Sequence, residues 1–186
     1  MSKVIITGTP GSGKTTILSK LSKEFRIVSI GTEMMKRLSK RLESRDDIRR
    51  NLSHTEIKAM RKIVLEDISK INENIIIESH TSIKNGKKYE LGFFPEDFPM
   101  LMDVTAIIYI DASPNDILLR RINDKTRSRE AESADEITEQ RSVNLSLAAF
   151  YAQALGTPLY IIINRQDMVD TARKEVEQAI KESFSQ

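Results

Sequence analysis

The sequence predicts an α/β fold of three layers, in which a five-stranded parallel sheet lies between two layers of helices. Five short apolar runs alternate along the chain with longer segments whose apolar residues recur at helical spacing. The runs are continuous rather than alternating in polarity, as is typical of parallel strands that are buried on both faces. The chain has 186 residues and no internal repeat or low-complexity tract, so we expect one compact domain over residues 1–186.

Several element boundaries carry their own signals. Ser53 and Glu56 have the spacing of a capping box, and Ser113 precedes a proline at the first helical position. Gly156, with Pro158 just beyond it, ends the longest helix. The predicted strands are 3–7, 26–30, 75–77, 105–110 and 159–163. The predicted helices are 16–23, 33–42, 44–50, 53–71, 113–122, 134–155 and a last one from 167 onwards.

Residues 80–99 fit neither a helical nor a strand period. They contain Asn85-Gly86, Gly92, Pro95 and Pro99, all of which favour turns. We therefore expect a long loop here, and a loop of this length is uncommon unless it has a function.

Composition narrows the class of protein. The hydrophobic content of 39% and the charged content of 30% are ordinary for a soluble globular chain. The absence of cysteine excludes disulfides and thiolate metal sites and is compatible with a reducing compartment. No apolar run approaches the ~20 residues of a membrane span, and Met1 to Lys3 lead directly into the first strand, so we expect a cytoplasmic protein without a signal peptide. A net charge of +2 is too balanced to favour nucleic-acid binding.

One glycine-rich motif lies between the first strand and the first helix. It has the pattern GxxxxGK[ST] and comprises Gly8, Thr9, Pro10, Gly11, Ser12, Gly13, Lys14 and Thr15, followed by Thr16. Between a strand and a helix, this pattern predicts a P-loop, whose backbone N–H groups surround phosphate oxygens. Lys14 would reach the outer phosphates, and the Thr15 hydroxyl would coordinate Mg²⁺. The alternative is a strand-to-helix turn that is merely rich in glycine.

A basic segment follows the fourth strand and its helix. Arg120 and Arg121 end that helix, and Arg127 and Arg129 follow within one short connection. Beside a P-loop, several guanidiniums could close over the transferring phosphates and stabilise their charge. The alternative is a solvated basic face paired with Glu130 and Glu132.

A second ligand site is expected at the carboxyl ends of neighbouring strands. Gly31-Thr32 opens a helix there, and Arg37, Arg45 and Arg49 follow and could hold a monophosphate, although each could equally be a surface arginine. Glu78 ends the third strand, where its carboxylate can orient Mg²⁺ through water. His80 is a candidate ligand contact, whereas His54, inside the capping box, is expected to be an inert surface residue.

Together these stretches resemble the archaeal-type adenylate kinases, a branch of the nucleoside monophosphate kinases. The matching pieces fall in order along nearly the whole chain. They are residues 8–16, 30–32, 44–49, 77–81, 120–129 and 162–165. The chain departs from the family pattern at Glu78, where aspartate is commoner, and around Arg129, where the family more often has Asn-Arg-Asp.

The resemblance implies a monophosphate-binding segment at about 31–71 and a short lid at about 120–132. It implies the reaction ATP + AMP ⇌ 2 ADP with Mg²⁺ and a homotrimeric assembly. It also implies that Asn164 and Arg165 lie near the adenine of ATP and that the loop after His80 lines the AMP side, where Gly31, Thr32, Arg45 and Arg49 would lie as well.

Three other functions remain open from the sequence. The acceptor could be another small molecule, such as CMP or a shikimate-like alcohol. The chain could instead be an ATPase module that acts on a protein or ribosomal partner, or a nucleotide-sensing module without turnover. Each predicts a different response of ADP formation to added AMP.

Overall fold

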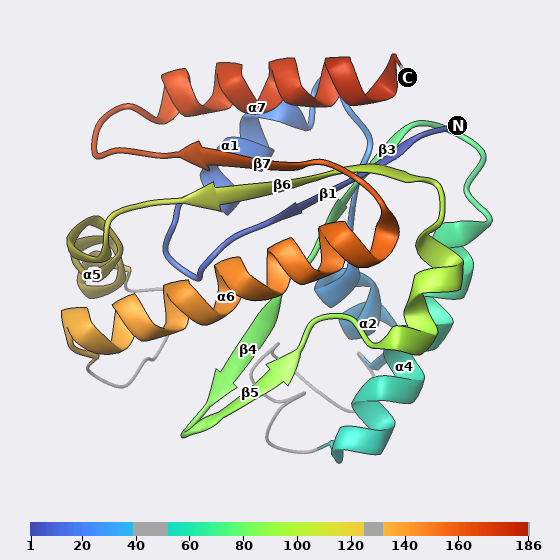
Figure 1. Cartoon of the computed structure of the whole chain (residues 1–186), viewed down its shortest axis with the longest axis horizontal. Coiled ribbons are helices and arrows are strands. Elements are labelled where there is room, and N and C mark those ends of the chain that lie inside the picture. The colour runs from blue at the N-terminus through green and yellow to red at the C-terminus, as the bar shows by residue number, and fades with distance from the viewer. Residues whose placement is uncertain (39–51, 125–131, 186) are drawn as a thin grey trace.

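The central layer is a sheet of five parallel strands in the order β2-β3-β1-β6-β7 (Figure 1). The computed structural model describes residues 1–38, 52–124 and 132–185. The strands are β1 (Lys3–Thr7), β2 (Ile27–Ser29), β3 (Ile75–Glu78), β6 (Val104–Asp111) and β7 (Leu159–Ile163). The central strand is β1, and its Ile6 pairs with Glu78 on one side and Ile108 on the other. The predicted fold class is confirmed.

Helices cover both faces of this sheet (Figure 1). On one face lie α1 (Lys14–Leu21) and α7 (Val169–Phe184), and on the other lie α2 (Ile30–Leu38), α4 (His54–Ser69) and α6 (Ala134–Leu155). The helix α5 (Pro114–Asn123) follows β6 and packs against α6. None of the helices in the described ranges combines the length and the hydropathy of a membrane-spanning segment.

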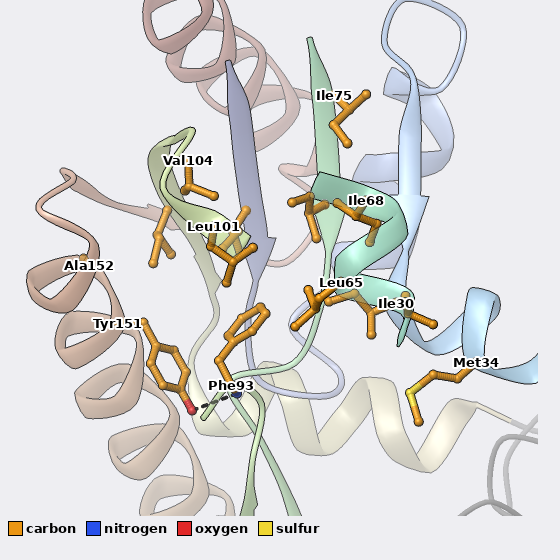
Figure 2. Close-up of a cluster of buried hydrophobic side chains, with 14 of the residues drawn as sticks. Ile30, Met34, Leu65, Ile68, Ile75, Phe93, Leu101, Val104, Tyr151 and Ala152 are labelled. Carbon is orange, nitrogen blue, oxygen red and sulfur yellow. Dashed lines mark hydrogen bonds between the residues drawn. The ribbon is translucent and has the colours of Figure 1, made fainter. Parts of the chain in front are cut away.

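The alternation of side chains along β1 divides the core into two clusters. Val4 and Ile6 point toward α1 and α7, whereas Ile5 points toward α2, α4 and α6. Figure 2 shows the second cluster, in which the rings of Phe93 and Tyr151 meet edge to face at 5.4 Å. The Phe93 N–H donates to the Tyr151 hydroxyl at 3.3 Å, so this buried hydroxyl is satisfied within the core.

The expectation of an irregular loop over residues 80–99 was wrong. This segment forms an antiparallel hairpin, β4 (Ser82–Asn85) and β5 (Lys88–Leu91), followed by the 3-10 helix η1 (Pro95–Leu101). The strands have only four residues each and are partly exposed, so they carry little periodic signal. Tertiary contacts hold the hairpin instead. Its two ends are joined by the Gly92 N–H, which donates to the Thr81 carbonyl at 2.7 Å.

The observed helix boundaries confirm the capping signals, but two helices begin at other residues than predicted. Ser53 and Glu56 form both bonds of a capping box, and Gly156 ends α6 with a φ of 65°. The helix α1 begins at Lys14, inside the glycine-rich motif, because Gly13 already serves as its N-cap. The helix α2 begins at Ile30, three residues earlier than predicted. Its predicted extension to residue 42 and the predicted helix 44–50 lie outside the described residues.

Candidate nucleotide-binding site

The glycine-rich loop joins the central strand β1 to α1, as the motif predicts. Gly13, the N-cap of α1, has a φ of 91°. A Cβ at Gly13 would lie 2.2 Å from the Asn164 side-chain nitrogen, so any other residue here would displace the Asn164 side chain and strain the backbone at this positive φ. Because glycine offers no capping side chain, the N–H groups of the first helical turn remain available to an anion.

Lys14 and Glu78 form an ion pair at the centre of the site. The Lys14 ammonium donates to Glu78 Oε1 at 2.9 Å, and the two side chains are 8% and 12% exposed. Burial alone would raise the pKa of Glu78, but the charge of Lys14 and hydrogen bonds from Ser29 and Lys14 outweigh it and lower this pKa to about 2. Glu78 is therefore an anion at neutral pH, beside the lysine expected to contact phosphate.

The residues around this pair fit a magnesium ion. Thr15 is exposed in the first turn of α1 and offers a hydroxyl oxygen, and the low pKa of Glu78 provides a charged carboxylate. Mg²⁺ prefers such oxygen ligands and keeps most of its own water, so one or two protein groups and a phosphate suffice.

Arg120 and Arg121 reach the loop, but they contact its carbonyl groups. Arg120 donates to the Ser12 carbonyl at 3.1 Å and to the Asn164 carbonyl at 3.0 Å. Arg121 donates twice to the Pro10 carbonyl, at 2.9 and 2.6 Å, and also pairs with Glu132, in part as the alternative reading expects. Their predicted contact with phosphate stays a prediction. Arg127 and Arg129 lie outside the described residues.

Asn164 lies at the carboxyl end of β7, against the same loop. Its side-chain nitrogen donates to the Ser12 carbonyl at 2.8 Å, and the residue is 3% exposed. Arg165 is exposed beside it. The structure thus brings Asn164 to the P-loop, and the contact of both residues with adenine stays a prediction.

A pocket adjoins the Lys14–Glu78 pair on the β3 side. Glu78 belongs to its wall, together with the predicted monophosphate residues Gly31 and His80. Thr32 follows Gly31 in the first turn of α2, where its N–H donates to the Ser29 hydroxyl at 3.4 Å. The rest of the wall comes from the ends of β2 and β3, from the start of α2, from α4, from the hairpin and from Phe94. These residues are Ser29, Ile30, Met34, His54, Ile57, Arg61, Ser79, Ile83, Glu90 and Leu91.

Two of the predictions for this side need comment. His54 is exposed, as expected, but it also lines the pocket and packs edge-on against Phe94 at 5.7 Å. It is therefore part of the site wall rather than a remote surface residue. Arg45 and Arg49 lie outside the described residues.

Arg61 is a pocket residue that the sequence analysis missed. It is 7% exposed and donates to the carbonyl groups of Leu91 and Gly92, at 2.8 Å for Leu91, so it fixes the end of β5. Burial lowers the pKa of Arg61, opposed by the nearby Asp97, and an arginine remains a cation at neutral pH. Its position in the apolar stripe of α4, four residues after Ile57, is the signal that could have revealed it.

Asp111 is a second strand-end carboxylate that was missed. It ends β6 next to the P-loop strand, is 1% exposed and accepts three hydrogen bonds from Arg141 of α6 at 2.6–2.9 Å. The signal was an acidic residue directly after a long apolar run. In the structure this pair joins the sheet to α6 beside the site.

Comparison with known proteins finds a family model that matches most of the chain and relatives that match nearly all of it. Residues 7–138 match the family model of an AAA domain. The chain is 36% identical to the adenylate kinase of Thermoplasma acidophilum, covering 92% of this chain and 94% of that one. It is 33% identical to the adenylate kinase of Methanocaldococcus jannaschii, covering 96% and 97%.

Solved structures share the architecture at low identity. Shikimate kinase from Acinetobacter baumannii, in complex with shikimate, matches with a TM-score of 0.69 at 14% identity, covering 98% of this chain and 94% of that one. Shikimate kinase from Bacteroides thetaiotaomicron matches with a TM-score of 0.63 at 12% identity, covering 97% and 98%. At such identities the likeness concerns the fold alone.

Proposed function

Because this chain belongs to the archaeal adenylate kinase family of P-loop proteins, we propose that it transfers the terminal phosphoryl group of ATP to AMP, with Mg²⁺, and forms two ADP. One observation supports this proposal above the others. Glu78 pairs with Lys14 of the P-loop and at the same time lines the neighbouring pocket. A phosphate cradle and a pocket that share one residue adjoin each other, as direct transfer between two bound nucleotides requires.

The P-loop side would hold ATP. Backbone N–H groups of the glycine-rich loop and of the first turn of α1 would bind its phosphates, and Lys14 would leave Glu78 for the β- and γ-phosphate oxygens. Thr15, and Glu78 through water, would hold Mg²⁺, which supplies charge neutralisation on the transferring phosphoryl group. Asn164 and Arg165 would lie toward the adenine.

The pocket beside β3 would hold the monophosphate. Gly31, Thr32 and His80 lie in or next to its wall, and Arg45 and Arg49 are proposed as ligands of the AMP phosphate. Arg120 and Arg121, together with Arg127 and Arg129, would stabilise the charge that develops during transfer. No covalent intermediate with the protein is needed, since positioning and charge stabilisation suffice for this reaction. By family resemblance, we also propose that the protein is cytoplasmic and that it forms a homotrimer. Light scattering after size-exclusion chromatography would test the trimer.

A coupled assay of ADP formation tests the reaction. We expect ATP alone to give little ADP, and AMP to accelerate its formation more than CMP, other monophosphates or shikimate do. Lys14→Ala should reduce the rate at least about 100-fold, since it removes a charge that faces the transferred group. Lys20→Ala, which removes an exposed lysine from the same helix, is the matched control.

The same assay separates the alternatives. ADP formation at a rate that does not depend on AMP would indicate an ATPase, and nucleotide binding without ADP formation would indicate a sensing module. Full AMP-dependent activity in Lys14→Ala would refute the assignment of the P-loop.

A further inference from the structure

One buried face of α6 carries three polar side chains. Gln140, Asn144 and Tyr151 follow one another at spacings of four and seven residues, which places them on one side of the helix. They are 5%, 1% and 1% exposed. Polar groups at such depth are retained where each has a hydrogen-bond partner, and the partners of these three lie on α5, in the P-loop and at the ends of the hairpin.

Gln140 contacts an arginine of α5, and Tyr151 contacts the two ends of the hairpin. Gln140 accepts a hydrogen bond at 2.7 Å from Arg121, which itself donates to the Pro10 carbonyl of the P-loop. Two turns along the helix from Asn144, the Tyr151 hydroxyl donates to the Thr81 carbonyl at 3.0 Å and accepts from the Phe93 N–H. Thr81 and Phe93 flank the two ends of the hairpin.

Asn144 lies between them and joins the two sites directly. Its carbonyl oxygen accepts from the hydroxyls of Thr81 and Ser82, each at 2.7 Å. Its side-chain nitrogen donates to the hydroxyl of Thr9 in the P-loop at 3.5 Å. The Thr9 hydroxyl is also hydrogen-bonded to that of Tyr109, at 2.8 Å, so it has a fixed partner in the sheet.

The hairpin root held by Asn144 is also a wall of the pocket. Ile83 of β4 and Glu90 and Leu91 of β5 line it, and Ser82 is the first residue of β4. A ligand that shifts these strands must shift the two hydroxyls on the Asn144 oxygen. Because the Asn144 amide is planar and the residue is buried, such a shift would turn the amide and change its bond to Thr9.

We propose that Asn144 is a positioning residue that couples occupancy of the acceptor pocket to the P-loop, through Thr81 and Ser82 on one side and Thr9 on the other. This rests on the proposed function, because it takes the pocket as the acceptor site. In thermodynamic terms, ATP and AMP change each other's affinity, and Asn144 transmits that change.

Binding measurements test the coupling. The dissociation constant of AMP is measured by calorimetry with and without a saturating non-hydrolysable ATP analogue, and the ratio of the two constants is the coupling factor. We expect a factor of about 5 or more in the unmodified protein, the lower end of typical allosteric coupling. Asn144→Leu, of similar size, and the double variant Thr81→Val with Ser82→Ala should bring it to within about twofold of unity.

Two further variants separate coupling from folding. Thr81→Ser keeps a hydroxyl for Asn144 and should preserve the coupling factor, while Ser146→Ala, on the exposed face of α6, should leave coupling and activity unchanged. If Asn144→Leu does not fold, the double variant, which leaves α6 intact, decides the matter.

Two results would overturn the inference: a coupling factor of one in the unmodified protein, or an unchanged factor in the folded double variant. Both are distinct from failure of the proposed function, which would appear as the absence of AMP-dependent ADP formation in the unmodified protein.

Discussion

The buried ion pair between Lys14 and Glu78 gives a quantitative prediction for Glu78→Gln. The pKa of Glu78 falls from its ordinary value of 4.5 to about 2 in the folded protein. At about 1.4 kcal/mol for each pH unit, this difference corresponds to about 3 kcal/mol of stability at pH 7. The glutamate side chain is 12% exposed, so little of this value is lost to solvent screening.

The sign of the pH dependence follows from the lowered pKa. The contribution of Glu78 is complete above about pH 4.5, where the carboxylate is charged in both the folded and unfolded chains. It is lost as the pH falls toward about 2, because the unfolded chain takes up the proton first. We therefore expect Glu78→Gln to be about 3 kcal/mol less stable than the unmodified protein at pH 7, and about 1.5 kcal/mol less stable at pH 3.

Urea denaturation at pH 7, 5, 4 and 3 measures these differences by linear extrapolation of the free energy of unfolding. Glu175→Gln, which removes an exposed carboxylate from α7, is the matched control and should show a difference near zero at every pH. If the gap between Glu78→Gln and the unmodified protein stayed constant from pH 7 to pH 3, the ion pair would not be the source of the stability.

Three further substitutions probe the two halves of the site and the fold. Gly13→Ala places a Cβ 2.2 Å from the Asn164 side-chain nitrogen, at a φ of 91° that alanine rarely adopts. Titration with a fluorescent ATP analogue should therefore show an affinity weakened about tenfold or more. An unchanged affinity would contradict the loop geometry. Gly92→Ala brings a Cβ within 1.9 Å of the His80 carbonyl oxygen, so calorimetry should find AMP binding weakened about tenfold, with ATP binding nearly unaffected. Equal losses for both nucleotides would count against that separation. Ser133→Ala removes the capping box of α6 and should cost about 1 kcal/mol, seen as a lowering of Tm by about 2–4 °C, and an unchanged Tm would show that the cap is dispensable.

The sheet could be predicted from the sequence because its signals are local. Residues 75–77 are three consecutive isoleucines, each fully buried in β3, and a run of this kind has few alternative structures. The P-loop was predictable for a similar reason, since its function depends on consecutive residues. Likewise, Ser53 and Glu56 reveal the start of α4 because their contacts span a single turn.

The hairpin and the partners of the arginines could not be predicted in this way. The hairpin depends on Asn144 and Tyr151, which lie more than 50 residues away in the sequence. Arg120 and Arg121 were expected to close over phosphates and in the structure donate to P-loop carbonyls, because a sequence does not distinguish a guanidinium that faces phosphate from one that donates to a peptide carbonyl. Arg61 and Asp111 were missed because their importance lies in which distant groups they meet.

The contacts of Arg120 and Arg121 with the P-loop have a consequence for how the loop meets its ligand. Arg121 donates to the Pro10 carbonyl and Arg120 to the Ser12 carbonyl, and the Asn164 side-chain amide donates a further bond to Ser12. A peptide whose oxygen is engaged by a cation becomes a stronger donor at its nitrogen end. These contacts orient and polarise the two peptides of the cradle within the protein itself, which lowers the entropic cost of ordering the loop around a phosphate.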